Sequence, residues 1–170
     1  EELIEIVEDV FASLGLRVTL HVNNRKLLAA MAETLGADDR VVDLTVAIDK
    51  LEKIGFEGVA EELGGKGFSQ SQIARLQEMV AVEGDNAARL DAIASAAQGA
   101  PSAESGVAEM RRLLELTKLA VIRMPIKLDL SLARGLNYYT GAIFEVKARD
   151  VQIGSVCGGG RYDNLTGIFG

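Results

Sequence analysis

Two segments near the C-terminal end of the chain carry its densest polar chemistry. Residues 134–141 read Arg-Gly-Leu-Asn-Tyr-Tyr-Thr-Gly, and residues 158–165 read Gly-Gly-Gly-Arg-Tyr-Asp-Asn-Leu. Between them they hold all three tyrosines of the chain, together with two arginines and several glycines. Side chains of these types, next to backbone that lacks Cβ atoms, can close around a small polar ligand. We therefore expect the two segments to form a binding site.

Arg134 is the residue best suited to bind an anion. A guanidinium between two strand-like runs, beside Gly135, can hold a phosphate or a carboxylate through two parallel hydrogen bonds. Tyr139 lies an odd number of residues away, so a bend or bulge at Gly135 is needed to bring both side chains to one face. The alternative interpretation is that Tyr138 and Tyr139 are core aromatics and that Arg134 forms a surface ion pair.

The glycines at 158–160 also point to a ligand. Glycine weakens the middle of an ordinary strand, because it has no side chain to pack and loses more conformational entropy, so close approach of backbone to a ligand explains the run better. Arg161 and Asp163 can pair with each other. Tyr162, between them, offers a phenol that can donate to a polar substrate.

Two potentially reactive residues, Cys157 and His21, do not form a convincing catalytic pair. Cys157 stands beside glycine amides, but His21 is the single histidine of the chain and lies more than a hundred residues away. We expect Cys157 to be buried and inert, and His21 to be a solvated or hydrogen-bonded surface residue on the polar face of a strand. With one cysteine and one histidine, a structural zinc site of the usual kinds is excluded, and we expect no metal bound by the protein itself.

Composition indicates a globular protein. The chain has 170 residues, 48% of them hydrophobic, and a formal net charge of −7, which does not favour a nucleic-acid binder. No apolar run approaches the roughly 20 residues that span a bilayer, and the sequence opens on acidic residues rather than on a signal pattern. We expect no membrane association and a cytoplasmic location.

The hydrophobic pattern changes period along the chain. Helical spacing over 1–14 and 25–36 flanks an alternating run at 16–22, and the asparagines before residue 25 can cap the second helix. From residue 43 to 122 the pattern predicts helices only, separated by turns at 64–67 and 98–103. The first of these helices carries Leu44, Ile48 and Leu51 on one face, and Ser69 can cap the helix that follows the turn at 64–67. Alternation returns at 126–132 and at 142–146, and the latter run forms a hairpin with 151–153.

This order predicts an α+β fold with an antiparallel sheet and flanking helices, interrupted by an inserted helical domain. The expected boundaries are 1–42 and 123–170 for the two parts of the sheet domain and 43–122 for the insertion.

At residues 134–141 and 158–165 the chain resembles the histidyl-tRNA synthetases, a family of class II aminoacyl-tRNA synthetases. Both histidine-specific signatures of that family are present, in the expected order and at close to the expected separation. The resemblance extends over the whole chain, including Asn-Asn-Arg-Lys at 23–26 and Ile-Asp-Lys-Leu at 48–51.

The resemblance implies a class II catalytic sheet and a reaction in which histidine and ATP, with Mg²⁺, give histidyl-adenylate, whose histidyl group passes to tRNA(His). The arginine matching Arg134 contacts the ATP α-phosphate and the histidine carboxylate, and so binds both substrates and stabilises the transition state. The residues matching Tyr138, Tyr139, Tyr162, Gly158, Gly159 and Gly160 form the histidine site. The full-length protein is expected to be a homodimer.

The chain departs from the family pattern in two ways. Residue 137 is Asn where the family usually has Asp, which removes a charge beside Arg134. The class II motif for dimerisation and the motifs that supply the other ATP contacts do not occur in these 170 residues, so we expect an internal fragment that is inactive alone.

A second class of function uses the same fold. Similar signatures occur in a regulatory subunit of ATP phosphoribosyltransferase and in the synthetase-like domain of a stress-sensing kinase. These proteins bind ligands and do not ligate. The presence of Arg134, Tyr139 and Tyr162 and of a helical block at 43–122 favours the synthetase.

Overall fold

A computed structural model describes residues 1–133, 138–151 and 153–168, and it contains one four-stranded sheet and seven α-helices within them. The elements in chain order are α1 (Glu2–Ser13), β1 (Val18–Asn24), α2 (Arg25–Thr34), the 3-10 turn η1 (Asp38–Arg40), α3 (Val41–Ile48), α4 (Leu51–Gly65), α5 (Gln70–Val80), α6 (Asn86–Ala96), α7 (Ala103–Leu119), β2 (Ile126–Leu128), β3 (Ala142–Ala148), β4 (Ser155–Gly160) and the 3-10 turn η2 (Thr166–Ile168).

The sheet has the strand order β2-β1-β3-β4. β3 runs antiparallel to both β1 and β4, as the sequence predicts, but β1 and β2 are parallel. All the helices from α2 to α7 lie between β1 and β2 in the chain, and a connection of that length can return a strand in the parallel direction. The sheet with flanking helices is confirmed, with one parallel pair.

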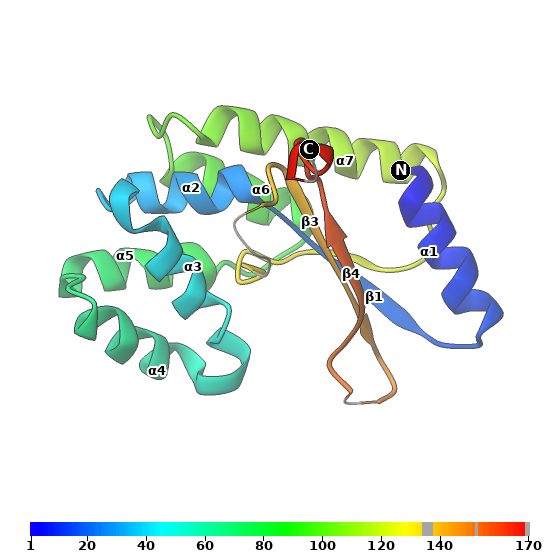
Figure 1. Ribbon diagram of the computed structural model, residues 1–170, viewed down its shortest axis with the longest axis horizontal. Coiled ribbons are helices and arrows are strands. Elements are labelled where there is room, and N and C mark those ends of the chain that lie inside the picture. Colours follow the sequence, from blue (N-terminus) through cyan, green and yellow to red (C-terminus); the bar gives the residue numbers. More distant parts are fainter. Residues whose placement is uncertain (134–137, 152, 169–170) are drawn as a thin grey trace.

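β1 and β3 are the two interior strands of the described sheet, and the core is built on them. Leu20 and Val22 are almost fully buried, and they share one face with Phe144 and Val146 of β3. That face lies beneath α1, while the helices from α2 to α6 gather beyond one end of the strands and α7 runs across that end toward α1 (Figure 1). Asn24 ends the strand and caps α2 through its side chain, which accepts a hydrogen bond from the Lys26 amide, as predicted.

Two predicted strands have different bounds in the structure. β2 ends at Leu128 rather than at residue 132, because Asp129 begins a turn in which the Leu132 amide donates to the Asp129 carbonyl at 3.0 Å. The return strand of the hairpin is not at 151–153. It is β4, and the three glycines at 158–160 lie inside it.

The helical region follows the predicted turns closely. The turn predicted at 64–67 begins only at Lys66, because Gly64 and Gly65 end α4, and Ser69 then caps α5 in a capping box with Gln72. The single helix expected around Leu44 and Leu51 is instead two, α3 and α4, and Gly55 with a φ of 67° kinks α4 near its start. One continuous hydrophobic core joins these helices to the sheet, so the domain boundaries at 43 and 122 stay a prediction.

No helix in the described part of the chain is long and apolar enough to cross a membrane.

Substitution of Gly106 in α7 tests how closely α7 packs on α2. A Cβ at this position would lie 3.0 Å from Leu27 Cδ2 and 3.1 Å from the Leu27 amide nitrogen, and Leu27 is fully buried. We expect Gly106→Ala to lower the free energy of unfolding by about 1–3 kcal/mol, although alanine is the better helix former. Urea unfolding measures the change.

The control is Gly64→Ala in α4, where the added Cβ meets nothing within 4 Å. This variant should be more stable by about 0.5–1 kcal/mol. Equal effects of the two substitutions would contradict close packing of α7 on α2.

Candidate functional site

The two polar segments meet at one end of the β3–β4 hairpin. The Thr140 amide donates to the Arg161 carbonyl at 2.9 Å, and the Arg161 amide donates to the Ala142 carbonyl at 2.8 Å. These bonds place Tyr138 and Tyr139 beside Tyr162. Arg134, the predicted anion-binding residue, lies outside the described residues, as do the positions 135–137.

The three tyrosines form one aromatic cluster. The ring of Tyr138 meets that of Tyr139 edge to face, with centroids 4.6 Å apart, and stacks on that of Tyr162 at 4.8 Å. All three side chains are partly buried. Burial, with a hydrogen bond to Tyr138, raises the pKa of Tyr139. A phenol is protonated at neutral pH even at its usual pKa, so Tyr139 can act as a hydrogen-bond donor.

Gly160 allows this cluster to approach the sheet. A Cβ at Gly160 would lie 2.7 Å from a ring carbon of Tyr139 and 2.8 Å from the Ala142 carbonyl oxygen. A Cβ at Gly159 would meet nothing within 4 Å, and one at Gly158 would touch only the Phe144 carbonyl, at 3.3 Å. Gly160 is therefore required by the close contact with the Tyr139 ring. At Gly159 the absence of a side chain leaves the surface of the strand open.

The three glycines also border an apolar cavity of about 580 Å³ between α1 and the sheet. Phe144, Val146 and residues of α1 form most of its wall, and Cys157 lies at its edge. Cys157 is exposed, so the expectation of a buried cysteine is wrong. Its side chain lines this cavity, which α1 leaves open, so Cys157 stays accessible.

A polar network surrounds the hairpin end on the side of α2 and α7. Arg161 Nε donates to Asp163 Oδ1 at 2.7 Å, the pair that the sequence suggests, and Thr140 Oγ1 donates to Asp163 Oδ2 at 2.8 Å. Glu109 of α7 accepts from Lys26 Nζ at 2.6 Å and lies 3.9 Å from Arg161 Nη1. Burial opposes ionisation of Glu109, but hydrogen bonds, chiefly from Lys26, hold its pKa below the usual value.

His21 is hydrogen-bonded, one of the two expected states, but it is buried rather than on the surface. Its Nδ1 lies 2.7 Å from Asp129 Oδ2, and the side chains are only 10% and 9% exposed. Asp129 Oδ1 also accepts from the Ser131 hydroxyl at 2.6 Å and from the Ser131 amide at 3.1 Å. Burial opposes ionisation of Asp129, but these hydrogen bonds outweigh it and hold the pKa of the carboxyl well below its usual range.

The sequence contains no local signal for the His21–Asp129 pair, because its partners are 108 residues apart. Alternation correctly sends His21 to the face opposite Leu20. That face is covered by the turn after β2, so a polar residue on it is not exposed to solvent.

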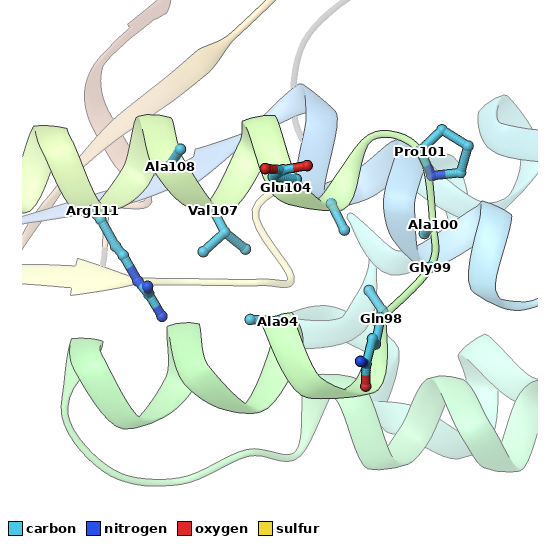
Figure 2. A pocket seen from close by; sticks show the side chains of 11 residues that line it. Ala94, Gln98, Gly99, Ala100, Pro101, Glu104, Val107, Ala108 and Arg111 are labelled. Atoms are coloured by element: carbon cyan, nitrogen blue, oxygen red, sulfur yellow. The ribbon is translucent and has the colours of Figure 1, made fainter.

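A second cavity, of about 600 Å³, lies between α6 and α7 (Figure 2). Small residues such as Ala94 and Ala108 line much of it. Arg111 extends from α7 toward α6, where its Nη2 donates to Asp91 Oδ1 at 2.7 Å. Because this guanidinium already pairs with a carboxylate, the cavity presents no chemistry comparable with that of the tyrosine cluster.

The fold and the two signature segments define a catalytic domain of the class II aminoacyl-tRNA synthetases and their relatives. The family model described as Histidyl-tRNA synthetase matches residues 1–170, and the chain therefore belongs to the histidyl-tRNA synthetase family.

Similar proteins agree with this assignment. The chain is 52% identical over 169 residues to a histidine–tRNA ligase of Bacteroides fragilis and 48% identical to that of Porphyromonas gingivalis, with 99% of this chain aligned. It spans 37% of the length of each of these relatives. The crystal structure of histidyl-tRNA synthetase from Nostoc sp. PCC 7120 superimposes with a TM-score of 0.90 at 29% identity, over 99% of this chain and 41% of that one.

A solved structure titled as an ATP phosphoribosyltransferase regulatory subunit/histidyl-tRNA synthetase, from Bacillus halodurans, has a TM-score of 0.77 at 23% identity. It covers 98% of this chain and 44% of its own, and at that identity it establishes a shared fold only.

Substitution of Gly160 tests the contact with Tyr139. Gly160→Ala should displace the Tyr139 ring and lower the free energy of unfolding by about 1–3 kcal/mol, because the added methyl group overlaps a ring and a carbonyl. Near-ultraviolet circular dichroism of the tyrosines should change with it. Gly159→Ala is the matched control, and its spectrum should stay that of the wild type. A change of the same size in both variants would contradict the contact.

Substitution of Asp129 tests the buried pair. Asp129→Ala should lower the free energy of unfolding at pH 7 by about 1.5–3 kcal/mol, the usual worth of hydrogen bonds to a charged group. The folded pKa lies below the unfolded value of about 3.9, so this contribution is complete above roughly pH 5 and is lost as the pH falls through the folded pKa. Urea unfolding at pH 7 and pH 3 should therefore give a smaller difference at pH 3. The exposed Asp9→Ala should differ little from wild type at either pH, and a loss for Asp129→Ala that does not depend on pH would contradict the assignment.

Proposed function

We propose that the full-length protein containing this chain is a histidine–tRNA ligase. It would join histidine to ATP, releasing pyrophosphate and forming histidyl-adenylate, and then transfer the histidyl group to the 3′ end of tRNA(His). The observation that carries the proposal is that both histidine-specific signatures are present and that their tyrosines form one cluster at the end of the β3–β4 hairpin. Membership of the family over the whole chain supports it.

In this proposal Arg134 binds the α-phosphate and the histidine carboxylate. Its positive charge would offset the negative charge that develops at phosphorus, an effect that is strong where water is excluded. This role rests on the match of residues 134–141 to the family signature. Arg134 is thus the residue assigned to catalysis, and the other site residues bind histidine.

The tyrosines and glycines would form the histidine pocket. Tyr139 and Tyr162 are assigned to the substrate imidazole, and Tyr138 supports both rings by direct contact. A protonated phenol at Tyr139 can donate to an imidazole nitrogen, and a site built on such a bond rejects analogues that lack the acceptor. Gly158, Gly159 and Gly160 would line the wall of the histidine pocket, and the lack of a side chain at Gly160 leaves room for the Tyr139 ring.

The remaining substrates and partners belong to the larger protein. ATP binds with Mg²⁺, but the described residues contain no group of three acidic, histidine or cysteine side chains that could hold a metal, so no step is assigned to the ion here. We propose a cytoplasmic homodimer in which the helical block at 43–122 is an inserted domain that contacts tRNA(His).

The alternative is a histidine-sensing regulatory paralogue. The fold shared with the Bacillus halodurans protein is the observation in its favour. Both functions require histidine binding, so the tyrosine cluster favours the ligase only together with Arg134 of the same signature and with the 52% identity to a histidine–tRNA ligase. Only the reaction with ATP separates them.

The deciding experiment is histidine-dependent exchange of pyrophosphate into ATP, measured with full-length protein. Arg134→Ala should lower the rate by roughly 10²–10³-fold, the usual cost of removing one group that stabilises transition-state charge, while histidine binding weakens less. Arg123→Ala, an exposed arginine just before β2, is the control and should keep the wild-type rate. If the wild-type protein binds histidine but catalyses no pyrophosphate exchange, the result contradicts the ligase proposal and favours the regulatory paralogue.

A further inference from the structure

The two signature segments fit into each other at two glycines. The Tyr139 ring lies over Gly160, where a Cβ would come within 2.7 Å of a ring carbon. In the reverse direction, the side chain of Arg161 lies over Gly141, where a Cβ would come within 2.9 Å of Arg161 Cδ. Each segment thus supplies a glycine that accommodates a side chain of the other, and the two backbones lie closer than larger residues would allow.

A single carboxylate connects the two segments beside the tyrosines. Asp163 Oδ1 accepts from Arg161 Nε at 2.7 Å, and Asp163 Oδ2 accepts from the Thr140 hydroxyl at 2.8 Å. The Asp163 amide donates to Thr140 Oγ1 at 3.3 Å. Both side-chain bonds favour the ionised carboxylate and hold the pKa of Asp163 below its usual value. Thr140, Arg161 and Asp163 together form a clamp between the two segments.

The clamp adjoins the tyrosines that are assigned to the substrate imidazole. Thr140 directly follows Tyr139, and Arg161 and Asp163 stand on either side of Tyr162. Among the described residues, backbone hydrogen bonds between the segments end at Arg161, and past that point the hydrogen bonds that join them are those of Asp163. The position of the Tyr162 phenol relative to that of Tyr139 therefore depends on the clamp.

The first segment is itself fixed to the body of the domain. The Arg25 amide, where β1 passes into α2, donates to the Gly141 carbonyl at 2.8 Å. On the α7 side, Glu109 accepts from Lys26 Nζ and lies 3.9 Å from Arg161 Nη1, so the far end of the Arg161 side chain also faces an anchored carboxylate. The clamp thus ties the second segment to a part of the structure that is already held in place.

We propose that Asp163 is a positioning residue for histidine recognition, because by joining the two segments it fixes the phenols of Tyr139 and Tyr162 relative to each other. This role rests on the proposed function, in which the two phenols bind the imidazole of histidine. Asp163 acts through the tyrosines and not on the substrate. A pocket whose binding-competent arrangement is populated only part of the time binds more weakly in proportion, so loss of the clamp should lower the affinity for histidine.

The test uses full-length protein, with the dissociation constant of histidine from calorimetry and KM values from pyrophosphate exchange. Asp163→Ala should weaken histidine binding by roughly 5- to 30-fold, the factor that corresponds to the loss of one or two hydrogen bonds of ordinary strength. KM for histidine should rise with it. KM for ATP and kcat should change much less, because the lost alignment affects the binding of histidine and not the reacting phosphate.

The matched control is Asp150→Ala. Asp150 also pairs with an arginine on the surface of the same hairpin, accepting from Arg17 Nε at 2.9 Å, but at the opposite end of β3. Both aspartates are exposed, so each variant should lose little stability. Asp150→Ala should bind histidine as the wild type does, and a loss confined to Asp163→Ala then reports the position of the tyrosines rather than folding.

A second pair of variants tests the same bond from its other end. Thr140→Val should weaken histidine binding in the same direction, and Thr140→Ser, which keeps the hydroxyl, should restore most of the affinity. In the Asp163→Ala background Thr140→Val should add little, because the two residues act through one bond. An equal loss in both aspartate variants, or wild-type affinity in folded Asp163→Ala, overturns the role. If Asp163→Ala does not fold, the comparison of the two Thr140 variants decides.

The two proposals fail in different ways. Wild-type protein that binds histidine without exchange refutes the ligase, and the calorimetric comparison still decides the role of Asp163. Exchange by the wild type, together with unchanged histidine affinity in Asp163→Ala, leaves the ligase assignment intact and refutes the positioning role.

Discussion

The fold depends on hydrogen bonds within the protein that pair the buried polar residues on one face of the sheet. His21 and Asn23 point away from the apolar face of β1, and in an isolated sheet they would be solvated. Here the turn after β2 covers them, so each buried polar group must find a partner within the protein, and Asp129 and the carbonyls of Leu130 and Leu132 are those partners. The need to satisfy these groups fixes the path of the chain toward the candidate site.

The helices and strands could largely be predicted, because they depend on local periodicity. Helix spacing located the described α-helices except α4, and alternation located β1 and β3, while Ser69 and Asn24 marked helix starts through the chemistry of capping. Neither the break between α3 and α4 at residues 49–50 nor the kink inside α4 at Gly55, whose φ is 67°, was predicted, because hydrophobic period does not report either of them.

The candidate site was only partly predictable. The two segments that meet at the hairpin end were identified by their residue types. The buried state of His21 was not, because exposure of a strand face is decided by a segment 108 residues away. The placement of the glycines inside β4 was also unexpected. Glycine costs conformational entropy in a strand, but that argument leaves out the packing of a neighbouring aromatic ring in the space that a side chain would fill. Gly160 has no side chain, and Tyr139 fills that space.

The parallel pairing of β1 with β2 has a consequence for the order of synthesis. Leu20 pairs with Ile126, so the sheet cannot close until the ribosome has made the whole helical region between them. Contacts of such high sequence separation slow folding, because loop closure costs entropy before the strands repay it. The helices α2–α7 have been synthesised by then, and once folded they can shorten the distance between β1 and β2. A nascent chain that stalls before residue 126 would leave both edges of β1 unpaired, because β2 and β3 are still to be made, and unpaired edges are surfaces that chaperones cover and that aggregation exploits.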